Sequence, residues 1–167
     1  MKSYLNNPKL PRGVRNNNPG NLRIGAAWKG RVKGTDTAFV TFESYAWGVR
    51  AMILLLANKY KQGQTTVRKL ISSWAPPVEN HTNSYVRHVA KALSVGPDDI
   101  LSLTKENMFR LTSSIAAKES GPKWALSRDD FEDGYSLFKG KLPEVAAAGA
   151  GLGLAVATVL IAFKLFS

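Results

Sequence analysis

Five segments of this 167-residue chain repeat their apolar residues at helical spacing, which restricts the fold to a mainly helical class. Residues 46–60 are apolar on nearly every face, as expected for an enclosed central helix. The other four segments each carry a single apolar face and span residues 66–74, 82–95, 104–118 and 127–138. The last of them opens with Ser127 and Asp130, which have the spacing of a helix N-terminal capping box.

The residues before these helices predict a structured turn and a small β-hairpin. Residues 16–21 read Asn-Asn-Asn-Pro-Gly-Asn, side chains that cap their own backbone and tolerate left-handed conformations. Two short apolar segments, residues 22–24 and 39–42, lie on either side of a loop that contains Gly and Lys, as in a small hairpin. We therefore expect a mainly α fold with one small β-hairpin.

The end of the chain is a separate segment. Residues 145–163 carry no charge and are followed by Lys164. At about 1.5 Å per residue a helix over them would measure about 28 Å, close to the roughly 30 Å hydrocarbon core of a bilayer. The sequence thus predicts one C-terminal transmembrane helix over residues 145–164, the alternatives being a buried helix or a hydrophobic terminal arm.

The expected organisation has four parts. They are an extended basic arm, a folded domain, a linker and a lipid membrane anchor, at residues 1–15, 16–138, 139–144 and 145–164. The chain would then be a single-pass membrane protein with a C-terminal anchor.

The chain is strongly basic, with 23 Lys or Arg against 12 Asp or Glu and a net charge of +11. Such a charge attracts polyanions, which include nucleic acid, an anionic membrane surface and the acidic polymers of a bacterial envelope. The sequence has no Cys, which excludes disulfides, zinc–thiolate sites and thiol nucleophiles, and its two His leave little for a metal site. We expect neither a metal nor a cofactor.

Glu119 is the first candidate for a catalytic acid. It lies four residues after Ile115 in an apolar-faced helix, so its side chain is expected at the edge of the core on the last helical turn. The helix dipole and desolvation there both disfavour the negatively charged carboxylate. A carboxyl group that donates a proton must be held in its neutral form, so this position suits a catalytic acid. The alternatives stay open: Glu119 is an exposed helix-end residue, or the acid is Glu43 or Glu79, each of which can instead cap the following helix.

Three stretches carry a resemblance to a known superfamily. Residues 116–121, Ala-Ala-Lys-Glu-Ser-Gly, are similar to the A-x-x-E-S-G motif at the end of the catalytic helix in lytic transglycosylases and glucosaminidases of the lysozyme superfamily. Residues 17–44 resemble the Asn-rich turn, hairpin and helix start that follow this helix in those families, and residues 74–86 resemble their substrate loop. Here the E-S-G helix comes last, so the resemblance implies a circularly permuted lysozyme-like fold.

Residues 12–137 as a whole resemble a family of bacteriophage and prophage proteins described as virion structural proteins or predicted lytic transglycosylases. With the predicted anchor, the resemblance implies a location in a virion's internal membrane or in the host inner membrane. Two positions depart from the pattern. Pro122 and Lys123 follow E-S-G where an aromatic residue is common, and residues 81–83, His-Thr-Asn, stand where the substrate loop has T-D-P.

The resemblance implies that Glu119 protonates the glycosidic oxygen between the amino sugars of peptidoglycan, in a lytic transglycosylase or muramidase that acts on the way into or out of the host cell. Tyr45, Trp74 and Tyr85 are candidates to stack on sugar rings, although Trp74 and Tyr85 lie on apolar helical stripes and equally fit the core. The asparagines of the turn can bind N-acetyl groups or simply hold the turn. The full set of expected substrate-binding residues is Asn17, Asn18, Asn21, Tyr45, Glu79, Asn80, Thr82 and Tyr85.

Two other functions compete with the enzyme hypothesis. The first is a non-enzymatic membrane protein of the virion that links capsid proteins to an internal membrane. The second is nucleic-acid binding, which ranks third because the basic residues are scattered and no basic-aromatic binding motif is present.

Overall fold

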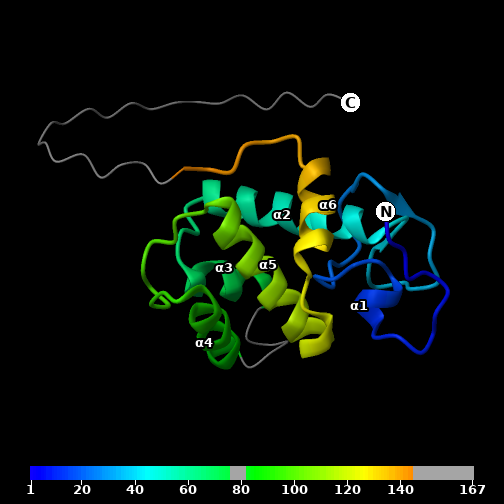
Figure 1. The fold of residues 1–167 in the computed structure, drawn as a ribbon, viewed down its shortest axis with the longest axis horizontal. Coiled ribbons are helices and arrows are strands. Elements are labelled where there is room, and N and C mark those ends of the chain that lie inside the picture. The colour runs from blue at the N-terminus through cyan, green and yellow to red at the C-terminus, as the bar shows by residue number, and fades with distance from the viewer. Residues whose placement is uncertain (76–81, 145–167) are drawn as a thin grey trace, which may run out of the picture.

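Helix α2 (Tyr45–Lys61) lies at the centre of the helical part of the molecule (Figure 1). Helices α3, α5 and α6 pack against it, and α4 packs on α3 and α5. The computed structural model describes residues 1–75 and 82–144. Ten of the 17 residues of α2 are buried, which confirms the enclosed central helix expected from its apolar sequence. The hydrophobic core is therefore built along this helix.

The five helices predicted for the folded domain are all present among the described residues. Thr66 and Thr104 cap α3 and α5 by accepting hydrogen bonds from backbone N–H groups, and the capping box of Ser127 and Asp130 begins α6. A short helix, α1, and the 3₁₀ helix η1 were not expected. The bounds are α1 Arg12–Arg15, α3 Val67–Trp74, α4 Thr82–Leu93, α5 Lys105–Ser120, η1 Pro122–Trp124 and α6 Arg128–Leu137.

The small sheet consists of two antiparallel strands, β1 (Arg31–Val32) and β2 (Thr41–Phe42). The sequence placed the first hairpin segment at residues 22–24, and these residues instead form an isolated antiparallel bridge between Arg23 and Phe39. The chain continues past this bridge and returns through Gly30, whose φ of 75° suits glycine, before β1 begins. The expected small antiparallel pairing is confirmed, with its first strand later in the chain than predicted.

Helix α6 crosses α2 at a very short distance (Figure 1). A Cβ atom added at Gly134 of α6 would lie 2.5 Å from the Cβ of Val49 and 3.1 Å from the carbonyl oxygen of Ala46, both on α2. Only a residue without a side chain allows the two backbones to approach this closely. Gly134 therefore sets the position of α6 on the central helix.

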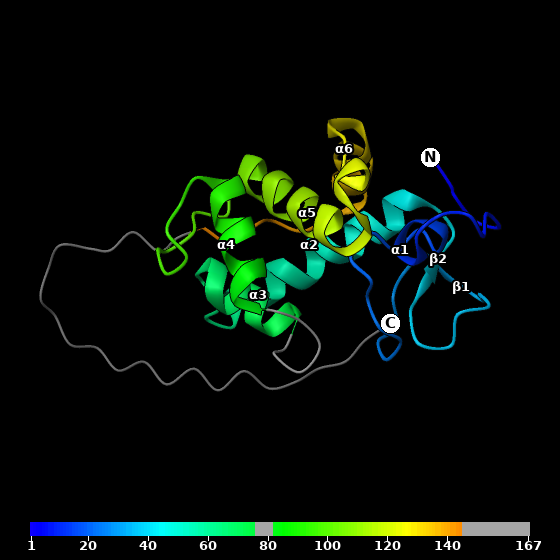
Figure 2. The same cartoon turned by 90° about the horizontal axis from the view of Figure 1, so that it is seen from below.

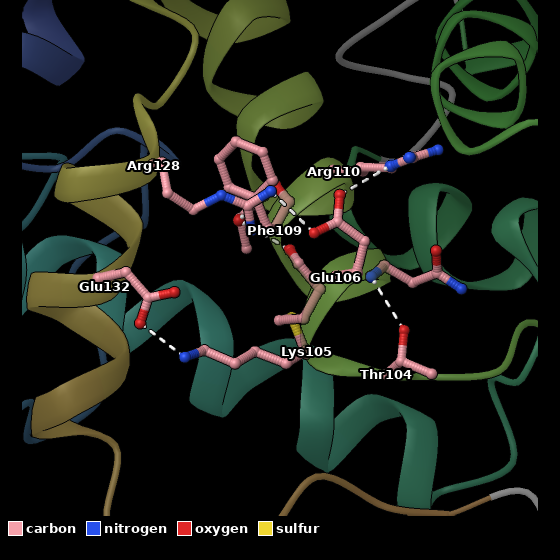
Figure 3. Close-up of polar contacts among 10 residues, drawn as sticks. Thr104, Lys105, Glu106, Phe109, Arg110, Arg128 and Glu132 are labelled. Carbon is pink, nitrogen blue, oxygen red and sulfur yellow. Dashed lines mark hydrogen bonds and ion pairs between the residues drawn. The ribbon is translucent and has the colours of Figure 1, made fainter.

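Helices α5 and α6 are joined at the start of α5 by charged side chains (Figure 3). The guanidinium of Arg128 lies 3.9 Å from the ring centroid of Phe109 and donates to Glu106 at 2.8 Å. Lys105 and Glu132 form a second pair between the same helices at 2.6 Å. Exposed pairs contribute little individually, so these contacts mainly fix the orientation of α5 while the core supplies the stability.

The N-terminal arm lies against the helical body. Lys2 forms an ion pair with Asp130 of α6 at 2.6 Å, and the ring of Tyr4 packs edge-on against Tyr45 at 5.1 Å between centroids. Residues 1–15 were predicted to form an extended arm, but the last four of them form helix α1 (Arg12–Arg15) instead.

The expected fold class included a C-terminal transmembrane helix, and this part of it is corrected. None of the helices found within residues 1–75 and 82–144 combines the length and the apolar character that crossing a bilayer requires. The segment to which the span was assigned, residues 145–164, lies outside the described residues. The supported fold class is mainly helical with a two-stranded antiparallel sheet.

We predict that Gly134→Ala lowers the free energy of unfolding by about 1–3 kcal/mol, because the added methyl group forces α6 away from α2. Alanine has the higher helix propensity, so a purely local effect would have the opposite sign. Urea denaturation of the full chain measures the change. Asp133→Ala, at an exposed position of the same helix, is the control; equal stabilities of the two variants would contradict the packing argument.

Candidate active site

Glu119 lies on the last turn of α5, where its carboxylate meets two other parts of the chain. Its Oε1 accepts a hydrogen bond of 3.1 Å from the hydroxyl of Tyr85 on α4, and its Oε2 accepts one of 3.1 Å from the side-chain Nδ2 of Asn21 in the Asn-rich turn. Glu119 itself is half-buried. The structure thus brings together three of the residues expected in the site from positions up to 98 residues apart in the chain.

Tyr85 is completely buried, on the stripe of α4 that also carries Val86 and Val89. Burial, and after it the nearby charge of Glu119, raise the pKa of the Tyr85 hydroxyl, which keeps it protonated and able to donate. A ring with no exposed surface has no face for a sugar to stack on. Tyr85 therefore orients Glu119 and belongs to the core at the same time.

Asn17 and Asn18 hold the turn from inside. Both have no exposed surface. The Nδ2 of Asn18 donates to the carbonyl oxygens of Leu22 and Val40, each at 2.9 Å, and its Oδ1 accepts from the Leu22 amide at 2.9 Å. Asn17 donates in the same way to the carbonyl oxygen of Phe42 at 3.0 Å. Two roles were left open for these residues, binding N-acetyl groups and holding the turn. Their burial and hydrogen bonds fit the second role.

Asn21 differs from its neighbours in the turn, because its side chain points to Glu119. It has a left-handed backbone with φ of 48°, a conformation that asparagine adopts more readily than most residues. Its Oδ1 is buried and accepts no hydrogen bond from any residue that the structure describes. The turn packs closely on the helices, since a Cβ at Gly20 would lie 2.7 Å from Trp74 and 2.8 Å from Met52.

A cavity of about 470 Å³ opens beside Glu119, between the Asn-rich turn on one side and α2 and α3 on the other. We refer to it as the groove. Within the described part of the chain, Glu119 is the one acidic side chain that lines it. The lining residues are Gly20, Asn21, Leu22, Arg23, Phe39, Leu55, Lys59, Ser73, Trp74, Ala75 and Glu119.

The groove contains residues that sequence reasoning did not assign to the site, chiefly Arg23, Phe39 and Lys59. Lys59 lies near the end of α2, where burial lowers the pKa of its ammonium group and its Nζ donates to the Ser73 carbonyl oxygen at 3.1 Å. No local motif marks these residues, because they come from three separate segments. Trp74, expected either in the core or against sugar, is half-buried and lines the groove.

Other expected site residues lie elsewhere. Glu43 is exposed just before α2 and does not line the groove. Tyr45 is buried against Tyr4 in the core.

Thr82 is the first residue of α4. Its hydroxyl donates to the carbonyl oxygen of Ala75 at 3.0 Å, which links the end of α3 to the start of α4. Glu79 and Asn80 lie outside the described residues.

The described residues contain no group of three or more His, Asp or Glu side chains placed to hold a metal ion.

The fold and the groove define a small, mainly helical protein whose groove, among the described residues, has one acidic lining residue, the half-buried Glu119, held by two hydrogen-bond donors. No protein-family model matches the chain. It is similar to Protein P5 of Pseudoalteromonas phage PM2, with 29% identity over 130 residues that cover 74% of this chain and 79% of that protein. The chain thus has a distant bacteriophage homologue, which fits the expected virion-associated protein; membership of a lytic transglycosylase family is not shown.

We predict that Asn18→Ala lowers the free energy of unfolding by about 2–3 kcal/mol, because it leaves the buried carbonyl oxygen of Val40 and the Leu22 amide without their partner. Asn83→Ala, at an exposed position on α4, should change stability by less than about 0.5 kcal/mol. Urea denaturation followed by circular dichroism compares the two. An Asn18 variant as stable as the Asn83 variant would show that the turn does not depend on the buried amide.

Proposed function

We propose that this protein is a virion-associated bacteriophage enzyme that cleaves the glycan strands of host peptidoglycan, with Glu119 as the general acid. The single observation that supports it most is the position of Glu119, half-buried at the end of α5 beside the groove and oriented by two hydrogen-bond donors. A general acid must be held within hydrogen-bond reach of the atom it protonates, and such a setting supplies that geometry. The similarity to a phage protein supports only the phage origin in this proposal.

The proposed reaction begins with transfer of the Glu119 proton to the glycosidic oxygen as the bond between that oxygen and the anomeric carbon breaks. Glycosidases that use two protein carboxylates need a second acid across the groove, whereas the described lining residues offer Glu119 alone. A mechanism in which the substrate's own groups supply the nucleophile needs only one. Closing a 1,6-anhydro ring on the sugar would then return a proton to Glu119.

Asn21 suits both protonation states of such an acid. In the structure its Nδ2 donates to the Glu119 carboxylate, while its buried Oδ1 has no described partner. Rotation of the amide by half a turn would instead present Oδ1 as an acceptor for the protonated carboxyl group. In our proposal Asn21 holds the carboxyl group in place throughout the proton transfer.

The competing function is a non-enzymatic structural protein of the virion. The similarity to Protein P5 of phage PM2 is compatible with it, because that name states no activity. A direct test of cleavage separates the two.

We predict that the full chain releases anhydro-muropeptides from peptidoglycan sacculi and that Glu119→Gln lowers kcat/KM at least about 100-fold, because the amide cannot donate the proton. Mass spectrometry of the released fragments identifies the product; hydrated ends would indicate a muramidase instead. Glu43→Gln is the matched control and should keep full activity, since Glu43 lies outside the groove.

The possible results distinguish which residue is the acid and whether the protein is an enzyme at all. Activity unchanged in Glu119→Gln but lost in Glu79→Gln or Glu43→Gln would move the acid to that residue. No release by folded protein would contradict the enzyme proposal and favour the structural function.

We further predict that Tyr85→Phe lowers kcat about tenfold and leaves KM nearly unchanged. The variant keeps the buried ring and removes only the hydroxyl that donates to Glu119, and one hydrogen bond to a charged group has this order of effect. Steady-state kinetics on sacculi measure both constants. A rise in KM at constant kcat would show that Tyr85 contributes to substrate binding and does not orient the acid.

A further inference from the structure

Positive charge is concentrated in residues 1–42, which we call the N-terminal lobe. These residues contain eight Lys or Arg and a single acidic residue, Asp36, in a chain of net charge +11. Asp36 is already engaged: its carboxylate accepts hydrogen bonds from the amides of Ala38 and Phe39 and from the side chain of Asn16, and lies 3.8 Å from Arg12. The lobe lies at one end of the molecule, opposite α3 and α4 (Figures 1 and 2).

Three cations of the lobe are available to a ligand. Arg31 and Lys33 are exposed, and Arg15 is half-buried with one N–H directed to the Leu10 carbonyl oxygen at 3.4 Å. Among the residues that the structure describes, no carboxylate forms an ion pair with any of the three. Their positive field is therefore not neutralised within the protein.

These cations line hollows in the surface. The largest of them, of about 790 Å³, lies between the arm and the loop that follows β1. Arg15, Lys33, Asn6, Asn7 and Asn16 are among its lining residues, and no described acidic residue lines it. Two smaller hollows of about 370 and 340 Å³ share residues with it and add Arg12 and Arg31, together with Asp36, whose carboxylate is already engaged as described above. Asparagine amides beside guanidinium and ammonium groups favour a ligand that carries carboxylates and amides together, as an acidic peptide does.

The hollows continue into the groove. Phe39 lines both the smallest hollow and the groove beside Glu119. The guanidinium groups of Arg12 and Arg23 lie 4.7 and 5.1 Å from the centroid of its ring; Arg12 lines one of the smaller hollows and Arg23 lines the groove. A polymer bound in the groove would meet the basic lobe at Phe39.

We propose that the N-terminal lobe binds the carboxylates of the peptide stems that project from a glycan strand held in the groove. This inference rests on the proposed function and adds the part of the substrate that the lobe recognises. Continuity with the groove favours this ligand over DNA, which would use the basic surface independently of Glu119. Arg31 and Lys33 act here as binding residues and have no part in proton transfer.

The test measures binding and does not depend on cleavage. The full chain carrying Glu119→Gln is co-sedimented with sacculi, with and without Arg31→Glu and Lys33→Glu. The double reversal should weaken binding about tenfold at low salt, and the difference should shrink at high salt because the interaction is screened. Sacculi whose carboxylates have been converted to neutral amides should bind the protein weakly and show no difference between the variants.

The matched control reverses two exposed lysines outside the lobe, Lys91→Glu and Lys139→Glu, with the same change in net charge. It should keep most of the binding to native sacculi. The milder pair Arg31→Gln and Lys33→Gln should give a smaller loss in the same direction, and circular dichroism verifies the fold of each variant.

Equal losses in the lobe and control variants would overturn the proposal, because net charge alone would then explain binding. Unchanged sacculus binding with a loss of affinity for duplex DNA or for phosphate-bearing lipid vesicles would also overturn it and assign the lobe to phosphate. If the lobe variant loses sacculus binding while the chain without any substitution shows no cleavage, the binding inference stands and only the enzyme proposal fails.

Discussion

The buried amides of Asn17 and Asn18 are the constraint on which the groove depends. Their side chains replace backbone hydrogen bonds that the irregular turn does not make for itself, reaching the carbonyl oxygens of Phe42, Leu22 and Val40. An unsatisfied buried polar group is costly, so the turn has one well-defined conformation only while these bonds are made. That conformation places Gly20 against α2 and α3 and turns Asn21 towards Glu119.

The helical frame supplies the opposite side of the site. Helix α5 carries Glu119 at its C-terminal end and is tied to α6 at its N-terminal end, while α6 is seated on α2 by the contact at Gly134. The position of the Glu119 carboxylate therefore depends on contacts at the other end of α5, about four helical turns away. Tyr85 connects this frame to α4, because a fully buried ring fixes the hydroxyl that Glu119 accepts from.

Charge divides the molecule into regions with different properties. The hydrophobic core runs along α2, the groove has a carboxylate with lysine and arginine in its lining, and the N-terminal lobe carries an excess of cations around Asp36. An anionic polymer would be attracted first to the lobe by its long-range field and then held by shorter contacts in the groove. The similarity to a protein of phage PM2 gives this arrangement a biological setting in bacteriophages.

The sequence by itself determined the helices, because apolar periodicity, threonine caps and the Ser127 capping box act between residues a few positions apart. It also singled out Glu119 and the Asn-rich turn as candidates. Tertiary structure decided which asparagine reaches the acid, that Tyr85 orients it from the core, and that Arg23, Phe39 and Lys59 line the groove. These contacts join residues as much as 98 positions apart, and packing of helices around α2, which no local pattern encodes, brings them together.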